Sequence, residues 1–313
     1  MNPAIRTENL GKHFGRTAAL DGVSLAVPEG AIYALVGRNG AGKTTLIKLL
    51  MNILRSSSGA ARVLDGDAAR LAGKAFSSIG YVSENQELPD WMTVGAFLNF
   101  CRPFYPQWDP ELAARMVEQF DLPLERRLRH LSRGMRMKAA FVSALAYRPR
   151  LIVLDEPFSG LDPLVRDELI ESLLELAGES TIFLSSHDLA EIESLASHVG
   201  YLEDGRLLFS EEMSALSARF CEVTVTLPGS AAARTDFPVE WIDVEISGAV
   251  IRFVHTQYEG EATERQVAGA FSSALSIVYD PMPLRAIFLA LAKSQRSRSR
   301  LAQADANART VNA

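Results

Sequence analysis

The chain contains little cysteine and no long hydrophobic run. Only Cys101 and Cys221 occur among its 313 residues, and two thiols so far apart, outside metal-ligand spacing, are typical of a reducing compartment. No run approaches the roughly 18 to 20 apolar residues that a membrane-spanning helix needs. The first residues also lack the apolar core of a signal peptide. We therefore expect a cytoplasmic protein, for which any membrane role comes through a partner.

An excess of basic residues is absent too. The formal net charge is -6, which argues against general nucleic-acid binding, because proteins of that class present a basic face. Hydrophobic residues make up 48% of the 313 residues. The chain can therefore bury a large core and is long enough for two domains.

The most informative stretch is the glycine-rich segment at residues 37–44. It follows an apolar run that predicts a buried strand (31–36) and leads into a predicted helix (45–50), the context in which the spacing GxxxxGK[ST] indicates a phosphate-binding loop rather than an incidental turn. Glycines let backbone N–H groups surround phosphate oxygens, and the helix points its positive end at the same anion. We expect Lys43 to reach the β- and γ-phosphates and Thr44 to ligate Mg²⁺. The other candidate contacts to a nucleotide here are Gly37, Asn39, Gly40, Ala41, Gly42 and Thr45.

Two carboxylates follow a second buried strand. Residues 151–154 are wholly apolar and end at Asp155 and Glu156, and open α/β sheets bind ligands at such carboxyl ends. Asp155 is the candidate for holding Mg²⁺ beside Thr44, and Glu156 is the candidate general base for an attacking water. A surface Asp-Glu pair is disfavoured by the apolar strand. His187 ends the next predicted strand, where it can sense or stabilise a γ-phosphate, although a lone histidine is more often structural.

Two further segments have both a functional and a structural interpretation. Phe14 lies upstream of the phosphate loop, where it either stacks on an adenine ring or packs in the core. Ser132 and Gly134 precede a predicted helix. They form either an anion site of backbone N–H groups or only a helix cap.

The pattern along the chain predicts an α/β core with insertions and a second domain. Residues 4–36 predict short strands, the first broken at residues 11–15, and residues of about 86–148 are helical in pattern. We place the first domain at residues 1–218. Alternating strands and two helices at residues 219–293 predict a small α+β domain. Residues 294–313 predict a disordered tail.

Taken together, these motifs resemble those of the ATP-binding cassette family, the nucleotide-binding subunits of ABC transporters. The resemblance covers residues 1 to about 215 and includes six motifs in the family's order. It implies a P-loop ATPase core with antiparallel β and all-helical subdomains. In this sequence the Q-loop position is Glu84, the signature is residues 131–135, the Walker B strand and catalytic glutamate are residues 151–156, the D-loop is residues 159–162 with Asp162, and the switch histidine is His187.

The resemblance also implies partners and a mechanism. Two cassettes would meet head to tail, with ATP and Mg²⁺ between one phosphate loop and the partner's Ser132 and Gly134. Closure and hydrolysis would drive an integral membrane permease, which places the chain at the inner face of the cell membrane. A homodimer needs no complementing partner because every motif is present, and a heterodimer is the alternative.

Three residues depart from the family pattern. Glu84 stands where glutamine is usual; a carboxylate can ligate Mg²⁺ but cannot donate a hydrogen bond, and Gln86 can substitute for it. Arg133 and Met135 replace signature residues. Glu84, the signature and residues 282–289 are similar to an exporter-type branch. The alternatives are an importer ATPase with a regulatory C-terminal domain, and a cassette ATPase acting on nucleic acid or the ribosome. The single motif set and the lack of sustained heptads disfavour the last alternative.

Overall fold

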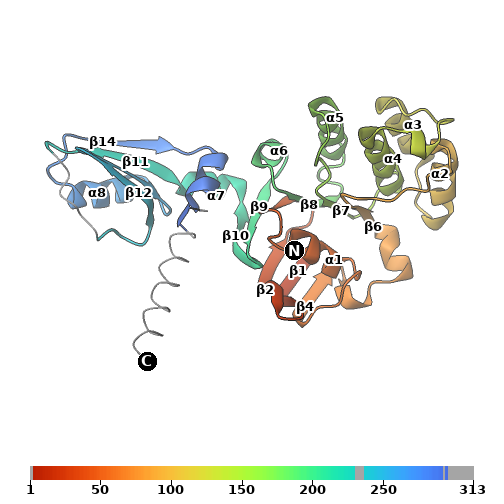
Figure 1. The fold of residues 1–313 in the computed structure, drawn as a ribbon, viewed down its shortest axis with the longest axis horizontal. Helices are drawn as coiled ribbons and strands as arrows, with labels where there is room; N and C mark the ends of the chain where they lie inside the picture. Colours follow the sequence, from red (N-terminus) through yellow and green to blue (C-terminus); the bar gives the residue numbers. More distant parts are fainter. Residues whose placement is uncertain (1–2, 230–235, 292, 295–313) are drawn as a thin grey trace. The chain divides into compact units, whose positions relative to one another are not determined.

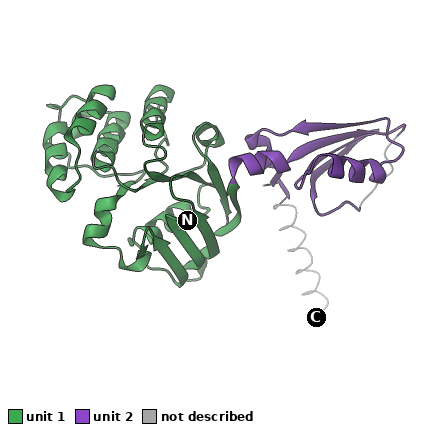
Figure 2. Cartoon of the chain, turned by 180° about the vertical axis from the view of Figure 1, so that it is seen from behind, with its two compact units in different colours: residues 1–211 green, residues 212–313 purple. Residues whose placement is uncertain are grey.

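The computed structural model describes residues 3–229, 236–291 and 293–294. The chain forms two compact units, Met1–Glu211 and Glu212–Ala313, which are coloured separately in Figure 2. This division falls a few residues before the boundary that the sequence predicts after residue 218. The difference arises because helix α7 (Met213–Arg219) groups with the second unit.

A six-stranded sheet forms the centre of the first unit (Figure 1). In order across the sheet, its strands are β10 (Arg206–Glu212), β9 (His198–Glu203), β3 (Ile32–Val36), β8 (Thr181–Ser186), β7 (Leu151–Asp155) and β6 (Ile79–Val82). The pairs from β9 to β6 are parallel. Strands β3, β7 and β8 are buried throughout, as apolar strands between two covering layers should be. Their carboxyl ends therefore meet at one edge of the sheet.

Helices follow three of these strands, and a second sheet packs on the first unit's core. The helices are α1 (Lys43–Leu50), α5 (Pro163–Leu174) and α6 (Leu189–Glu193). The second sheet is antiparallel, in the order β2 (Thr17–Val27), β1 (Ile5–Phe14), β4 (Ser58–Val63) and β5 (Gly66–Asp67). Short 3₁₀ helices follow it at Ala68–Arg70 and Gly73–Ser78. One hydrophobic cluster joins side chains of β1, β2, α1, β3, β7 and β8, so α1 lies within a shared core.

Strand β1 is longer than the sequence predicts. It runs for 10 residues, through Gly11 to Phe14, and the chain turns at Gly15 and Arg16, at the end of the segment 11–15 where the break is expected. Gly11 pairs with Ser58 of β4, and a Cβ at this position would collide with the Ser58 hydroxyl. The glycine is therefore present for a close approach between strands rather than for a turn.

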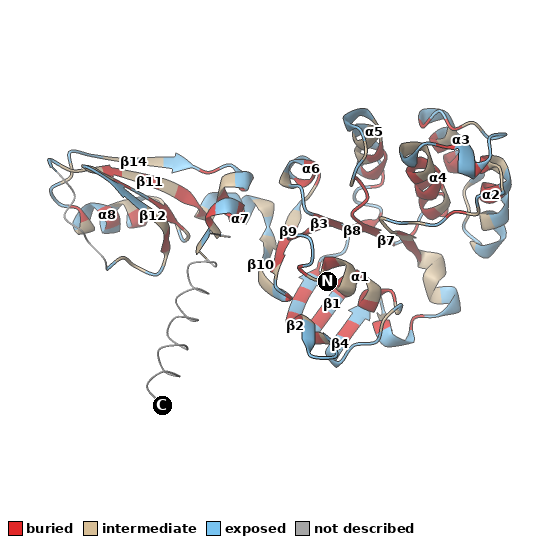
Figure 3. Ribbon diagram, viewed as in Figure 1, coloured by how far each residue is buried: buried red, intermediate tan, exposed pale blue. Residues whose placement is uncertain are grey.

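Helices dominate the segment between β6 and β7, as predicted. They are α2 (Val94–Cys101), α3 (Pro110–Gln119) and α4 (Arg133–Leu145), with 3₁₀ turns at Arg102–Phe104 and Leu128–His130. Side chains cap all three helices at their N-termini: Thr93 caps α2, Asp109 caps α3 and Ser132 caps α4. In Figure 3 the inward face of α4 is buried, which follows from its packing against β6 and α3.

The second unit is an antiparallel sheet with helices. The strand order is β12 (Trp241–Ser247), β13 (Val250–His255), β11 (Cys221–Thr226) and β14 (Ser276–Pro281), and helix α8 spans Glu261–Ala270. Residues 284–291 are also helical, while residue 292 of the predicted final helix lies outside the described part. Ser294, predicted to begin the tail, is still helical, and the remaining tail residues, 295–313, are not described.

Candidate nucleotide site

The phosphate loop connects β3 to α1, as the sequence predicts. Gly40 and Gly42 adopt φ angles of 84° and 108°, a region that favours glycine. A Cβ at Gly37 would collide with the carbonyl oxygen of Leu202 on β9. The loop backbone thus has its shape because side chains are absent at these positions, and it leads directly into the N-terminus of α1, the positive end of that helix.

Lys43, the first residue of α1, points back into this loop. Its Nζ donates to the carbonyl oxygens of Gly37 at 2.6 Å and Arg38 at 3.2 Å. It also lies 3.0 Å from Oε1 of Glu156. The residue is only 5% exposed, and a buried ammonium requires such partners. The loop and the carboxylate together hold one positive charge at the centre of the site.

Asp155 ends β7 next to the Thr44 hydroxyl. Oδ1 of Asp155 accepts hydrogen bonds from Thr44 Oγ1 at 3.1 Å and from Ser185 Oγ at 2.8 Å. Burial raises the pKa of Asp155; the two hydrogen bonds oppose this effect, and the nearby charges of Glu156 and Glu84 add to it. A hydroxyl and a carboxylate side by side are hard oxygen donors of the type that Mg²⁺ prefers. These two residues therefore fit the predicted magnesium site.

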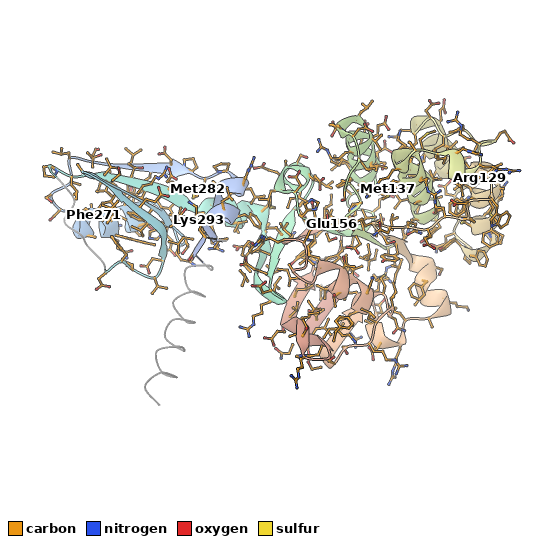
Figure 4. All side chains as sticks on the ribbon, in the orientation of Figure 1. Arg129, Met137, Glu156, Phe271, Met282 and Lys293 are labelled. Carbon is orange, nitrogen blue, oxygen red and sulfur yellow. The ribbon has the colours of Figure 1, made fainter. Side chains whose placement is uncertain are left out.

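Glu156 bridges Lys43 and His187. Its Oε1 faces Lys43, and its Oε2 lies 2.7 Å from Nδ1 of His187. Its φ angle of 50° is unusual for a residue other than glycine, and its N–H donates to Ser185 Oγ at 2.9 Å. The strand end therefore turns, and the carboxylate meets Lys43 at the end of the loop; Glu156 is labelled in Figure 4. The structure brings together all three residues predicted to act in hydrolysis.

The signature segment packs against the D-loop helix of the same chain. Ser132 caps α4 by accepting a hydrogen bond from Met135 N at 3.3 Å. Asp162 caps α5 in the same way, through Val165 N at 3.1 Å. A Cβ at Gly134 would lie 3.2 Å from the Val165 side chain. Ser132 therefore caps α4 within this chain, and its role toward a partner's nucleotide stays a prediction.

Glu84 contacts the signature and the D-loop. Its Oε1 lies 4.0 Å from Arg133 Nη2 and accepts a hydrogen bond from Ser159 Oγ at 3.4 Å. The guanidinium of Arg133 packs over Gly160, where an added Cβ would lie 2.9 Å from Nη1. The Q-loop glutamate and the signature arginine, both departures from the family pattern, thus form one ion pair.

Phe14 lies at the end of β1 and is not part of the core. It is 50% exposed, with Lys12 Nζ 5.0 Å above its ring. The core-packing alternative is therefore wrong, and the stacking role stays a prediction. Within the phosphate loop, Asn39 is exposed, Ala41 is buried and Thr45 is half-buried on α1.

Comparisons with known proteins point to one family. A model of the family described as ABC transporter matches residues 20–159. The bacitracin transport ATP-binding protein BcrA of Enterococcus faecalis is 32% identical over 255 residues, which are 77% of this chain and 82% of BcrA. The chain belongs to the ABC transporter family. It is an ATP-binding subunit of that family.

Two further similarities extend this result. The Fe(3+) ions import ATP-binding protein FbpC of Mesorhizobium japonicum is 34% identical over 247 residues, 72% of this chain and 67% of FbpC. A solved structure titled as the ATP-binding subunit of an ABC transporter aligns with a TM-score of 0.63 at 27% identity, covering 68% of this chain and 91% of that one. Over residues 3–229, 236–291 and 293–294, none of the helices is both long and apolar enough to cross a membrane.

One residue of this cassette was missed by the sequence analysis. Ser185 holds both Asp155, through its hydroxyl, and the N–H of Glu156. It is fully buried in β8. A hydroxyl near the end of a largely apolar strand was the available signal, but its partners, the last residue of β7 and the residue after it, are 30 and 29 positions away in sequence.

Proposed function

We propose that the chain hydrolyses ATP and thereby powers a separately encoded membrane permease. The observation that carries the proposal is the placement of Glu156, whose carboxylate contacts both Lys43 and His187 beside Thr44 and Asp155. A carboxylate next to a phosphate-binding loop suits general-base catalysis on an attacking water. The neighbouring ammonium suits stabilisation of the charge that develops on the transferred phosphoryl group.

Each residue of the site has a role in this proposal. The backbone of the phosphate loop and Lys43 bind the phosphates of ATP, and Phe14 stacks on the adenine. Thr44 and Asp155 hold Mg²⁺, with Glu84 as a further candidate, and the ion supplies charge neutralisation at the β- and γ-phosphate oxygens. His187 orients Glu156 through the 2.7 Å contact and reaches the γ-phosphate.

Dimerisation completes the site in this proposal. Ser132 caps α4 and Gly134 lies in its first turn, so their N–H groups lie at the positive end of a helix that can receive the partner's ATP. Asp162 caps α5. Two copies closing head to tail would place each signature on the partner's γ-phosphate, and hydrolysis would release it. Such a cycle can drive a permease through alternating access.

We assign the direction of transport as export. Glu84, the signature around Arg133 and residues 282–289 are similar to the exporter-type branch, and BcrA is named for bacitracin transport. The similarity to FbpC, which is named for import, makes import the second candidate. Purification of the tagged chain from native membranes distinguishes the two. The sequence of a co-purifying permease reports its type, and an associated substrate-binding protein contradicts export.

The proposal is tested by the variant Glu156→Gln. We expect kcat for ATP hydrolysis to fall by about 10²- to 10⁴-fold, because a general base is lost. The nucleotide should still bind, so the variant should accumulate as an ATP-bound dimer, which light scattering after gel filtration detects. Glu193→Gln, an exposed residue of α6, is the control. A Glu156→Gln protein that stays monomeric in excess Mg-ATP contradicts the dimer.

A further inference from the structure

Glu191 is a buried acidic residue that belongs to none of the motifs. It lies in α6 and is only 8% exposed. Its Oε2 accepts a hydrogen bond from Ser186 Oγ at 2.6 Å. Burial raises the pKa of Glu191, and the hydrogen bond from Ser186 opposes this effect. Removing a carboxylate from water is costly, and the hydrogen bond from Ser186 offsets part of this cost.

That partner, Ser186, connects the phosphate loop to the turn after β8. It is the last residue of β8, fully buried, and pairs with Val36 at the end of β3. Its carbonyl oxygen accepts a hydrogen bond from Gly37 N at 3.4 Å. Its hydroxyl oxygen accepts another from Asp188 N at 3.0 Å. One serine therefore links the first glycine of the phosphate loop to the residue after His187.

His187 depends on this turn for its direction. Its side chain is 42% exposed, so packing on the solvent side does not hold the imidazole. The residues on both sides of it are joined through the Ser186 hydroxyl, whose oxygen accepts a hydrogen bond from Asp188 N. The hydroxyl proton has two acceptors within reach, Glu191 Oε2 at 2.6 Å and the carbonyl oxygen of Asp188 at 3.1 Å, and the shorter contact is to Glu191. The backbone so fixed directs Nδ1 of His187 to Glu156 Oε2.

We propose that Glu191 is a positioning residue for ATP hydrolysis: by holding the Ser186 hydroxyl, it fixes the turn that directs His187 to Glu156. This inference rests on the proposed roles of Glu156 and His187. Glu191 itself touches neither nucleotide nor water in the reaction. Its loss should therefore lower turnover and leave nucleotide affinity unchanged.

Substitutions at Glu191 test the geometry in the full-length protein. Glu191→Leu removes the acceptor and retains the volume. We expect kcat to fall about tenfold with KM for ATP unchanged, as for the loss of one good hydrogen bond. Glu191→Gln keeps an acceptor oxygen and should restore most of the turnover. Glu193→Gln, exposed on the same helix, is the matched control. Loss of turnover in Glu191→Gln equal to that in Glu191→Leu overturns the proposal.

A double-mutant cycle with His187 separates positioning from a general structural role. If Glu191 acts through His187, Glu191→Leu adds no loss of kcat to His187→Ala. Losses that multiply overturn the inference. The ¹⁵N chemical shifts of the His187 imidazole should change in Glu191→Leu and stay as in wild type in Glu193→Gln. Unchanged shifts in Glu191→Leu contradict the positioning role. Should Glu191→Leu fail to fold, Ser186→Ala removes the same hydrogen bond and should give the same loss.

The outcomes also distinguish this inference from the proposed function. Wild-type kcat in His187→Ala contradicts the role of His187 and removes the basis of the inference. A strong loss in His187→Ala together with wild-type kcat in Glu191→Leu overturns only the inference.

Discussion

At the residue scale, the site is organised around the charge of Lys43. Its ammonium contacts two loop carbonyls and one carboxylate, all brought within 3.2 Å by the fold. A buried charge without such partners would shift toward its neutral form. The same contacts orient the ammonium toward the space enclosed by the loop, where phosphates are expected.

Replacing Lys43 should weaken nucleotide binding. In Lys43→Ala we expect the Kd for ATP to rise by about 10- to 100-fold, because hydrogen bonds to charged groups contribute about 1.5–3 kcal/mol each. Isothermal titration with Mg-ATP measures this. Lys48→Ala, on the last turn of the same helix, is the control. Unchanged affinity in Lys43→Ala would mean that residues 37–44 do not bind phosphate.

At the element scale, the contact between α4 and α5 joins the helical insertion to the core. Lys138 of α4 forms an ion pair with Glu168 of α5 and donates to the carbonyl oxygen of Phe120 at 3.3 Å. The lysine side chain is 9% exposed and the glutamate 29%. Together with the contact of Gly134 with Val165, this pair holds the signature helix beside the D-loop helix.

Breaking one half of this pair should loosen α4. In Glu168→Leu the Lys138 ammonium is left buried with a carbonyl as its acceptor. We therefore expect the free energy of opening of α4 to fall by about 2 kcal/mol. That is below the roughly 3–5 kcal/mol of fully buried pairs, because water reaches Glu168. Native-state hydrogen exchange of α4 amides measures it, with Glu171→Gln as the control. The double variant Lys138→Met/Glu168→Leu should recover most of the loss, and equal losses in both would contradict the ion-pair explanation.

At the scale of the whole molecule, the second unit has its own aromatic core. Trp241 stacks on Phe253 with ring centroids 4.1 Å apart, and α8 covers them with Val267. His255 is the last residue of β13 and pairs with Trp241 of β12. It is only 2% exposed, and its Nδ1 accepts a hydrogen bond from Gln257 N at 3.2 Å. Burial lowers the pKa of His255 below its ordinary value of 6.5, and the charge of Glu240 opposes this effect.

The second unit should therefore lose stability in acid. Below pH 6.5 the unfolded chain binds a proton at residue 255 that the folded unit does not, so the free energy of unfolding falls as pH decreases from 6.5 toward the folded pKa. The slope from this one group cannot exceed about 1.4 kcal/mol per pH unit, the value for one full proton. Well above pH 6.5 the imidazole is neutral in both the folded and the unfolded chain, so it no longer changes the free energy of unfolding with pH.

Fluorescence of Trp241 reports this transition selectively once Trp91 and Trp108 are changed to Phe, because the chain has three tryptophans. His255→Asn keeps an acceptor for the N–H of Gln257 and should remove this part of the pH dependence. The same acid slope in His255→Asn and in the parent would assign the effect to other groups.

Much of the fold was predictable because its signals are local. The strand, loop and helix around residues 37–44, the hairpin at Asp204–Gly205 and the strands of the second unit each follow from neighbouring residues. The break predicted at residues 11–15 occurs only at its end, at Gly15, because a glycine in a strand, such as Gly11, and a glycine in a turn look alike in sequence. Only the partner strand, with Ser58 opposite, distinguishes the two.

The sequence by itself determined the candidate chemistry of this cassette: which residues are predicted to bind phosphate, which carboxylates end a strand and where the chain can turn. The tertiary structure decided which of them meet. Glu156 reaches His187 and the Ser185 hydroxyl, and Thr44 reaches Asp155, because β3, β8 and β7 are neighbours in the sheet. The same sheet places Ser186 between the phosphate loop and Glu191. Strand order depends on pairing between segments far apart in sequence, and the hydrophobic periodicity of a single strand does not indicate which strands lie beside it.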